Sequence, residues 1–472
     1  SIPLFVITIL VSAGMFERPG LDFVFGLGGF SLILPTIFLI LCVFVQKLSQ
    51  EKNKTRNGLF LLLGIIILGS SLLIINEDTN FIKLPSYRYL NAVNPFMLTM
   101  DPLTDSVSEH QTTDISSSFI FNSIYMIFGG IGIWIILNKK TIQNEIFIKK
   151  DLIAFILIFG ITGIYISSAF IRLELFASIA LIIFASIGLS ILTKEIFKNS
   201  FSGIKNHAFK ISFITIIFVL FTIPLVYPDS TGNWISVVDI PPVILTGGTN
   251  HPPSNDWFET LEWIKNNTPQ DAIIASWWDY GYWITTISDR TTFIDNATLI
   301  DSRIKHMAKI FLSSPDDGWK MLNEWNADYV VIFIAAERLE NFSNSGDRLY
   351  VLGNGGDETK AQWFIRIAGL PIHEYLHSDF ITINNNLLNN TLLGKMIPYS
   401  TIGYYDQSTG QSWTQFQPGF IPINVEDIKY ESENGPLELV YSSPSFTNEK
   451  NGSMNLVLVY KINENYTPVN SQ

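Results

Sequence analysis

The sequence has one cysteine, Cys42, and few charged side chains. A single cysteine excludes an internal disulfide, so any soluble part must be held together by its own hydrophobic core. Acidic residues outnumber basic ones, and the net charge of −12 argues against a nucleic-acid partner. Charged residues make up only 15% of the chain, which is low for a soluble protein of this length.

Long apolar runs fill the first half of the chain. Such runs exceed what a globular core buries, and each approaches the ~20 residues that a helix needs to cross a bilayer. No alternating barrel pattern is present, so helices are the expected form. The predicted spans are 28–48, 58–75, 119–137, 150–168, 173–193 and 208–226, with 1–14 as the end of another. Because the chain begins inside that hydrophobic run without a signal-peptide pattern, we expect residues upstream.

The second half is polar and mixed in charge. We therefore predict a transmembrane helical domain over 1–226 and a soluble domain over 227–472. Lys and Arg gather in alternate loops, which indicates the cytoplasmic side. These residues are Lys47, Lys52, Lys54, Arg56, Lys139, Lys140, Lys149, Lys150, Lys194, Lys198, Lys205 and Lys210. The long loop 76–118 and the soluble domain are then extracytoplasmic, on a multi-pass protein that we expect in the cell membrane.

Strand and helix patterns alternate in the soluble domain and predict a mixed α/β fold, with a mainly parallel sheet and sites at the strand carboxyl ends. The expected strands are 272–278, 291–294 and 329–334, and the expected helices are 301–312, 316–325 and one from Ser254 or Asn255 to Lys265 that buries Trp257, Leu261 and Ile264. Strands at 437–442 and 456–462, around an Asn451-Gly452 turn, predict a small β-rich C-terminal part.

The run Trp277-Trp278-Asp279-Tyr280-Gly281 follows the predicted strand 272–278. Two neighbouring indoles fit a packed corner of the core, since each buries about 150–250 Å². They also fit a small polar pocket. A hydroxyl group donates and accepts a hydrogen bond, so an indole N–H and the Asp279 carboxylate are suitable partners for it. Such a pocket would reject ligands that lack the hydroxyl.

Three further segments carry candidate residues. Glu109 lies in the polar run 106–111, where a solvated loop is the simpler interpretation. Arg172 lies at the external edge of two spans, beside Glu174, where an arginine commonly reaches for lipid headgroups. Asp357 and Lys360 are one turn apart at a predicted helix start, a common surface pair.

The pentapeptide Trp277–Gly281 resembles the WWDYG motif of the catalytic subunit of oligosaccharyltransferases, and the archaeal type fits best. In that family the motif binds the Ser or Thr of the acceptor triplet Asn-x-Ser/Thr. The run 106–109 is similar to the family segment whose Glu contacts the acceptor, and 168–173 to the segment whose Arg holds the lipid diphosphate. Asp357 and Lys360 match a motif that packs behind the pocket, although Phe364 stands where the family has Met or Ile.

The resemblance implies a transfer reaction and its partners. Glu109 and Arg172 would be catalytic, Arg172 by holding the donor diphosphate. The acceptor-binding residues would be Trp277, Trp278, Asp279, Tyr280, Gly281, Asp357, Lys360 and Phe364. The partners would be a lipid-linked oligosaccharide on dolichyl phosphate or diphosphate, acceptor polypeptides and membrane lipids.

The resemblance covers the last seven or so spans of a thirteen-span fold. It also implies Mn²⁺ or Mg²⁺, with the metal ligands in the N-terminal loops that this chain lacks, so the fragment alone would be inactive. Another polytopic lipid-dependent glycosyltransferase, or a transporter or receptor with an external binding domain, remains the alternative. The acceptor triplets in the chain itself begin at Asn266, Asn296, Asn341, Asn389, Asn451 and Asn465.

Overall fold

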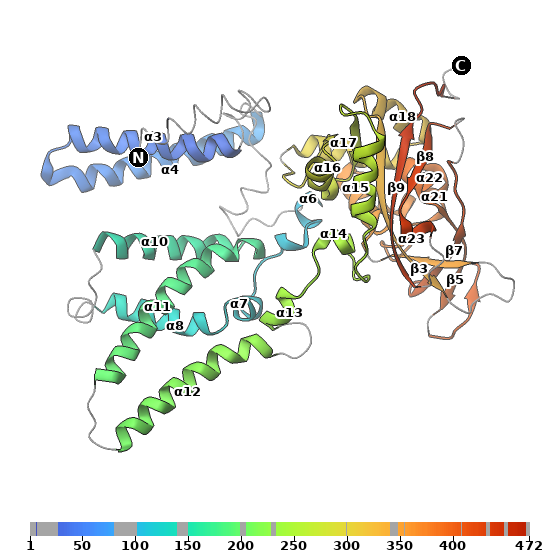
Figure 1. Cartoon of the computed structure of the whole chain (residues 1–472). Coiled ribbons are helices and arrows are strands. Elements are labelled where there is room, and N and C mark those ends of the chain that lie inside the picture. The colour runs from blue at the N-terminus through green and yellow to red at the C-terminus, as the bar shows by residue number, and fades with distance from the viewer. Residues whose placement is uncertain are drawn as a thin grey trace. The chain divides into compact units, whose positions relative to one another are not determined.

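The computed structural model (Figure 1) divides into two compact units, Ser1–Tyr89 and Leu90–Gln472. The residues that it describes are 6, 27–79, 102–138, 150–198, 204–227, 233–298, 300–339, 348–353, 355–406, 408–430, 435–447 and 452–468. The predicted span end at 1–14, apart from Val6, most of loop 76–118, the acceptor triplets at Asn341 and Asn451, and Lys139, Lys140 and Lys149 lie outside them. The domain boundary placed after residue 226 stays a prediction.

The first unit contains two long apolar helices, α3 (Leu27–Leu48) and α4 (Lys54–Thr79), joined by the short helix η1 (Glu51–Asn53). They contain the predicted spans 28–48 and 58–75. The connection between them carries the basic residues expected there, and Lys54 forms an ion pair with Glu51.

Apolar helices also open the second unit. They are α7 (Ile115–Asn122), α8 (Ile124–Leu137), α10 (Lys150–Ser167), α11 (Glu174–Lys198) and α12 (Ile204–Val226). Within the described residues, two stretches are long and apolar enough to cross a membrane, Ile171–Lys198 and His207–Val226. If the bent pair of α7 and α8 is counted as one span, three stretches of the described residues could cross a membrane. These helices and the mixed sheet below confirm the predicted fold class.

The predicted span 119–137 falls on a bent pair of helices. Helices α7 and α8 meet at 92°, and Ser123 between them has a positive φ of 47°. Polar side chains explain the break. Glu174, which is buried at the start of α11, accepts hydrogen bonds from Ser118 and from Asn122 Nδ2 (2.9 Å). Glu174 therefore holds α7.

Helices α8 and α11 pack closely through glycines. A Cβ atom on Gly132 would lie 1.9 Å from the carbonyl oxygen of Phe184, and one on Gly188 would lie 2.6 Å from that of Phe128. Small residues allow such an approach of two apolar helices, where packing must replace the hydrophobic effect.

The remaining elements build an α/β region. Its helices are α6 (Pro102–Asp105), η2 (Ser108–His110), α13 (Trp234–Val238), α14 (Val243–Thr246), α15 (Asp256–Asn267), η4 (Trp278–Tyr280), α16 (Gly281–Ile287), α17 (Asp301–Leu312), α18 (Pro315–Glu324), α19 (Asp357–Ala368), α20 (Ile372–Tyr375), α21 (Asn385–Asn390), α22 (Leu392–Met396) and α23 (Pro444–Thr447). Its strands are β1 (Ile273–Ser276), β2 (Thr291–Thr292), β3 (Tyr329–Leu339), β4 (Leu349–Leu352), β5 (Tyr399–Asp406), β6 (Ser412–Trp413), β7 (Phe420–Glu426), β8 (Leu437–Ser442) and β9 (Ser453–Ile462). The short helix η3 (Ile171–Leu173) lies between the apolar helices α10 and α11.

The nine described strands form one sheet, and the expectation that it is mainly parallel is wrong. Only β1 pairs in parallel, with β2 and β3. Strand β9 runs antiparallel beside β3 over nine residue pairs (Figure 1), and β8 pairs with β9. The predicted C-terminal strands therefore form an integral part of the sheet. These strands are far from β3 in the sequence, so local patterns could not predict the antiparallel pairing.

The main core lies between β3 and the helices around it. Eight consecutive residues of β3, from Tyr329 to Ala336, are buried. The predicted apolar face of α15 is confirmed, because Trp257, Leu261 and Ile264 are 1% exposed or less. Leu103 of α6 belongs to the same core. The segment that leads to Glu109 is therefore anchored on the α/β region.

Candidate functional site

A sharp turn at the end of β1 presents the Trp277–Gly281 motif. Strand β1 ends at Ser276, the short helix η4 begins at Trp278, and α16 begins at Gly281. A Cβ atom on Gly281 would lie 2.5 Å from the carbonyl oxygen of Ile294. Only glycine permits this contact, so the last residue of the motif is fixed by packing.

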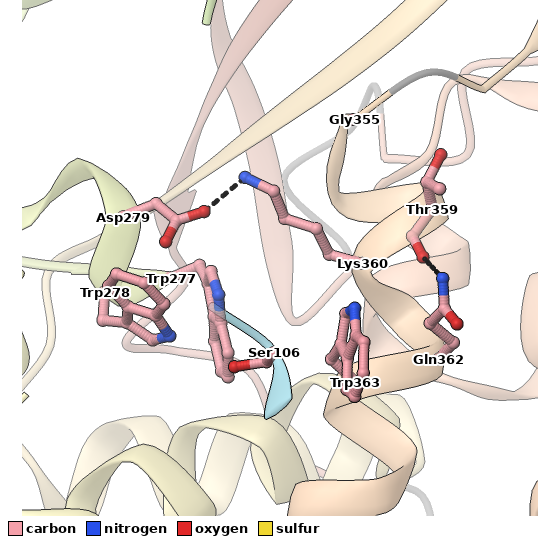
Figure 2. Close-up of a pocket in the computed structure, with 9 residues that line it drawn as sticks. All are labelled: Ser106, Trp277, Trp278, Asp279, Gly355, Thr359, Lys360, Gln362 and Trp363. Atoms are coloured by element: carbon pink, nitrogen blue, oxygen red, sulfur yellow. Dashed lines mark hydrogen bonds and ion pairs between the residues drawn. The ribbon is translucent and has the colours of Figure 1, made fainter. Parts of the chain in front are cut away.

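The motif lines a cavity of about 220 Å³ (Figure 2). Its walls come from three distant parts of the chain, namely the segment after α6, the turn after β1 and the helix α19. The lining residues are Ser106, Trp277, Trp278, Asp279, Gly355, Thr359, Lys360, Gln362 and Trp363. The buried Nε1 of Trp278 has no hydrogen-bond partner among the described residues. Trp278, which carries this unpartnered donor, thus lines the same cavity as Asp279.

A chain of polar contacts joins the motif to α19. Lys360 Nζ donates to Asp279 Oδ2 at 2.5 Å and to the Tyr280 hydroxyl at 3.0 Å. Tyr280 in turn donates to Asp357 Oδ1 at 2.8 Å. The backbone N–H of Phe333 in β3 donates to Asp357 Oδ2 at 2.9 Å. Asp357 and Lys360 begin a helix as predicted, but they are not an exposed surface pair.

Burial and charge set the protonation of this network. Burial alone would lower the pKa of Lys360, but the carboxylates of Asp279 and Asp357 outweigh it and raise that pKa. Burial raises the pKa of Asp357 to about 6 and that of Glu358 to about 8. The Oε2 atom of Glu358 is buried without a partner among the described residues. Lys360 is therefore charged at neutral pH, whereas Glu358 is largely neutral.

The variant Glu358→Gln should raise the melting temperature more at pH 8 than at pH 5. The folded-state pKa of Glu358 lies above its unfolded value, so its contribution to stability is complete below about pH 4.5 and is lost as the pH rises through about 8. Glutamine has no carboxyl group to ionise, so the variant does not lose this stability as the pH rises. Melting curves at both pH values measure the effect, at about 2–4 °C per kcal/mol for a domain of this size. An equal shift at both pH values would contradict it.

The motif residues that do not line the cavity lie behind it. Tyr280 is fully buried, and Phe364 packs on Trp277 with ring centroids 4.3 Å apart. Phe364, the departure from the family pattern, therefore supplies an apolar wall behind Trp277. The assigned acceptor-binding roles of Tyr280, Gly281, Asp357 and Phe364 stay predictions.

The two predicted catalytic residues lie side by side. Glu109 in η2 and Arg172 in η3 come from distant parts of the chain, and Arg172 Nε is 3.8 Å from Glu109 Oε2. Arg172 Nη1 also lies 3.0 Å from His110 Nε2, and the N–H of Ile171 donates to the carbonyl of Gln111 at 2.9 Å. Both partners of the pair are largely exposed, with side-chain fractions of 65% for Glu109 and 49% for Arg172.

Several residues were missed from the sequence. His110 was left unassigned, although it contacts Arg172 and packs on Phe170 at 4.8 Å. Trp363 and Thr359 of α19 also line the cavity. Trp363 lies three residues after Lys360, a helical spacing that could have indicated it, whereas no such signal marks Thr359 relative to Lys360.

The divalent metal implied by the resemblance stays a prediction. Within the residues that the structure describes, no three His, Cys, Asp or Glu side chains come together as a metal site would require. This part of the chain does not fit the metal by itself.

Comparison with known proteins supports the resemblance to oligosaccharyltransferases. Residues 270–331 match the STT3/PglB/AglB core domain. The STT3 subunit of dolichyl-diphosphooligosaccharide–protein glycosyltransferase from Dictyostelium discoideum is 24% identical, over 89% of this chain and 56% of its own length. The corresponding subunit from Saccharomyces cerevisiae is 26% identical, over 62% of this chain and 40% of its own length. The chain thus spans about half the length of the curated relatives it matches.

A solved structure of the Archaeoglobus fulgidus oligosaccharyltransferase in the apo form covers 94% of this chain and 53% of its own, at 13% identity and a TM-score of 0.49. The archaeal type stays a prediction, because the curated relatives named above are eukaryotic. The segment around the Trp277–Gly281 motif matches the STT3/PglB/AglB core domain, and the chain's resemblance to catalytic subunits of oligosaccharyltransferases is confirmed.

Proposed function

We propose that this chain is part of an enzyme that transfers an oligosaccharide from a dolichol-linked donor to the Asn of Asn-x-Ser/Thr acceptors. The relatives are named for that transfer, and the cavity beside Asp279 carries the proposal for this chain. The active face is extracytoplasmic, in the cell membrane, with Mn²⁺ or Mg²⁺ bound by the complete protein.

The cavity suits the acceptor hydroxyl. The N–H of Trp278 would donate to the hydroxyl oxygen, and the hydroxyl would donate to Asp279. Lys360 occupies only part of the accepting capacity of that carboxylate, which has about four lone-pair sites. An acceptor with Val in place of Thr would leave both groups unpaired, so the cavity would discriminate by hydrogen bonding.

The reacting groups lie beyond the cavity. Ser106 lines it, and Glu109 follows three residues later in η2. The acceptor asparagine, two residues before the hydroxyl, would extend toward Glu109, whose carboxylate would bind the carboxamide N–H. Hydrogen bonds to this group weaken its amide resonance and make the nitrogen a better nucleophile. The nitrogen would attack the anomeric carbon with inversion, and the lipid phosphate would leave toward Arg172.

A transfer assay with the complete enzyme tests the proposal. Peptides that differ only at the third position of the triplet should be used when it is Thr or Ser and fail when it is Val. The variant Trp278→Phe should raise the KM for the Thr peptide by about five- to tenfold, since it removes one hydrogen bond. Trp283→Phe is the matched control, because Trp283 packs on Trp257 in the core and does not line the cavity. Equal use of Thr and Val peptides would refute the proposal.

A further inference from the structure

Helix α16 begins without a cap of its own. The first N–H groups of a helix have no partner inside it and need one from elsewhere. The residue before α16 is Tyr280, whose side chain makes no capping bond, because its hydroxyl is bonded to Asp357. The partner comes from Asn296, whose Oδ1 accepts from the N–H of Tyr282 at 3.1 Å.

The same carboxamide makes a second bond to the motif. Asn296 Nδ2 donates to the backbone carbonyl of Asp279 at 2.8 Å. One planar group thus spans the junction between η4 and α16, accepting at Tyr282 and donating at Asp279. A carboxylate could not make both bonds, because it offers no donor.

The loop that carries Asn296 is itself fixed. Asp295 Oδ1 accepts from the N–H of Ala297 at 2.9 Å, and the N–H of Thr298 donates to the carbonyl of Asp295 at 3.0 Å. Gly281 lets this loop reach the motif, since any Cβ there would meet Ile294 and Asp295. Asn296 is therefore held in place from both sides, although its side chain is exposed.

We propose that Asn296 is a positioning residue that fixes the backbone of Asp279 and thereby aims the Trp278 and Asp279 side chains into the cavity. This inference rests on the proposed function. Asn296 also begins the triplet Asn296-Ala297-Thr298, which has the acceptor pattern. The hydrogen bonds give its carboxamide a structural task that does not depend on any attached sugar.

Two variants of the complete enzyme separate these roles. Asn296→Ala removes both bonds and should raise the KM for an Asn-x-Thr peptide about tenfold, with little change in kcat. Thr298→Val destroys the triplet but keeps the Asn296 carboxamide, so it should leave the KM unchanged. Asn296→Asp keeps the bond from Tyr282 and loses the one to Asp279, and it should give an intermediate KM.

Amide hydrogen exchange measures the positioning of the motif backbone without an activity assay. Exchange at Tyr282 should be faster in Asn296→Ala than in Thr298→Val, while β3 stays protected in both. If the amides of β3 also lose protection in Asn296→Ala, the KM of Asn296→Asp is the deciding measurement. A KM equal to that of the wild type in Asn296→Asp would then overturn the inference. Unchanged Tyr282 exchange and KM in Asn296→Ala, or the same KM increase in Thr298→Val, would also overturn it. Should the unaltered enzyme transfer nothing, the proposed function fails, and the exchange at Tyr282 still decides the role of Asn296.

Discussion

Replacing Arg172 by Gln is expected to lower the kcat of oligosaccharide transfer by about 10²- to 10³-fold and to leave the acceptor KM unchanged. In the proposed reaction the bond to the lipid phosphate breaks as the new C–N bond forms, and negative charge builds up on the departing phosphate. A guanidinium group binds two phosphate oxygens at once and stabilises that charge more in the transition state than in the ground state.

The present contacts of Arg172 do not prevent this role. Its ion pair with Glu109 is long at 3.8 Å and exposed, and such pairs contribute only about 0–1 kcal/mol. Binding a diphosphate in its place costs correspondingly little. The described contacts use Nε and Nη1, and a guanidinium has five N–H donors in all. Glu109, once released, is placed to bind the acceptor carboxamide.

Two controls sharpen the experiment. Arg172→Lys keeps the charge but loses the planar fork, so it should recover part of the kcat. Arg303→Gln removes an exposed arginine of α17 and should leave kcat unchanged. A rise in acceptor KM at unchanged kcat in Arg172→Gln would mean that Arg172 serves Glu109 and the acceptor rather than the donor. Single-turnover rates with saturating donor distinguish the two cases.

Local patterns predicted the elements that local sequence determines. The predicted bounds of α17 and β8 agree with the structure, because amphipathic period and alternation are complete within each segment. The pairing of strands in the sheet was not predictable from local patterns. Strand β9 returns from more than a hundred residues away to lie beside β3, and nothing within either strand specifies that partner. The same limit hid the bend between α7 and α8, which depends on Glu174 some fifty residues later.

The candidate site, too, was predictable from the sequence only in part. The sequence placed Asp357 and Lys360 one turn apart at a helix start, as the structure has them, but it did not show that Lys360 pairs with Asp279. The link from Asp357 through Tyr280 to Lys360 was not visible, because it joins side chains about eighty residues apart. In the sequence, Asn296 stands out as the start of an acceptor triplet, and nothing there indicates a hydrogen bond to the motif. Its two bonds to the motif depend on how closely Gly281 lets the loop approach.

Replacing Asp279 by Ala is expected to raise the KM for an Asn-x-Thr acceptor by about 10²-fold and to change the use of a weak acceptor without the hydroxyl far less. Two losses combine in this variant. The hydroxyl loses its acceptor, and the half-buried Lys360 loses the carboxylate at 2.5 Å. An unpaired charge in such a place weakens the whole cavity wall, so the single variant alone does not separate specificity from support.

The double variant Asp279→Ala with Lys360→Met separates them. It removes the unpaired charge, and the methionine chain follows the path of the lysine carbons past Tyr280, so the cavity wall should recover. Stability should return toward the wild-type value in thermal unfolding. Discrimination between Thr and Val acceptors should stay lost, because no carboxylate is left to accept from the hydroxyl. If the double variant instead recovers a preference for Thr, or if Asp279→Ala weakens both acceptors equally, then Asp279 acts only as the partner of Lys360.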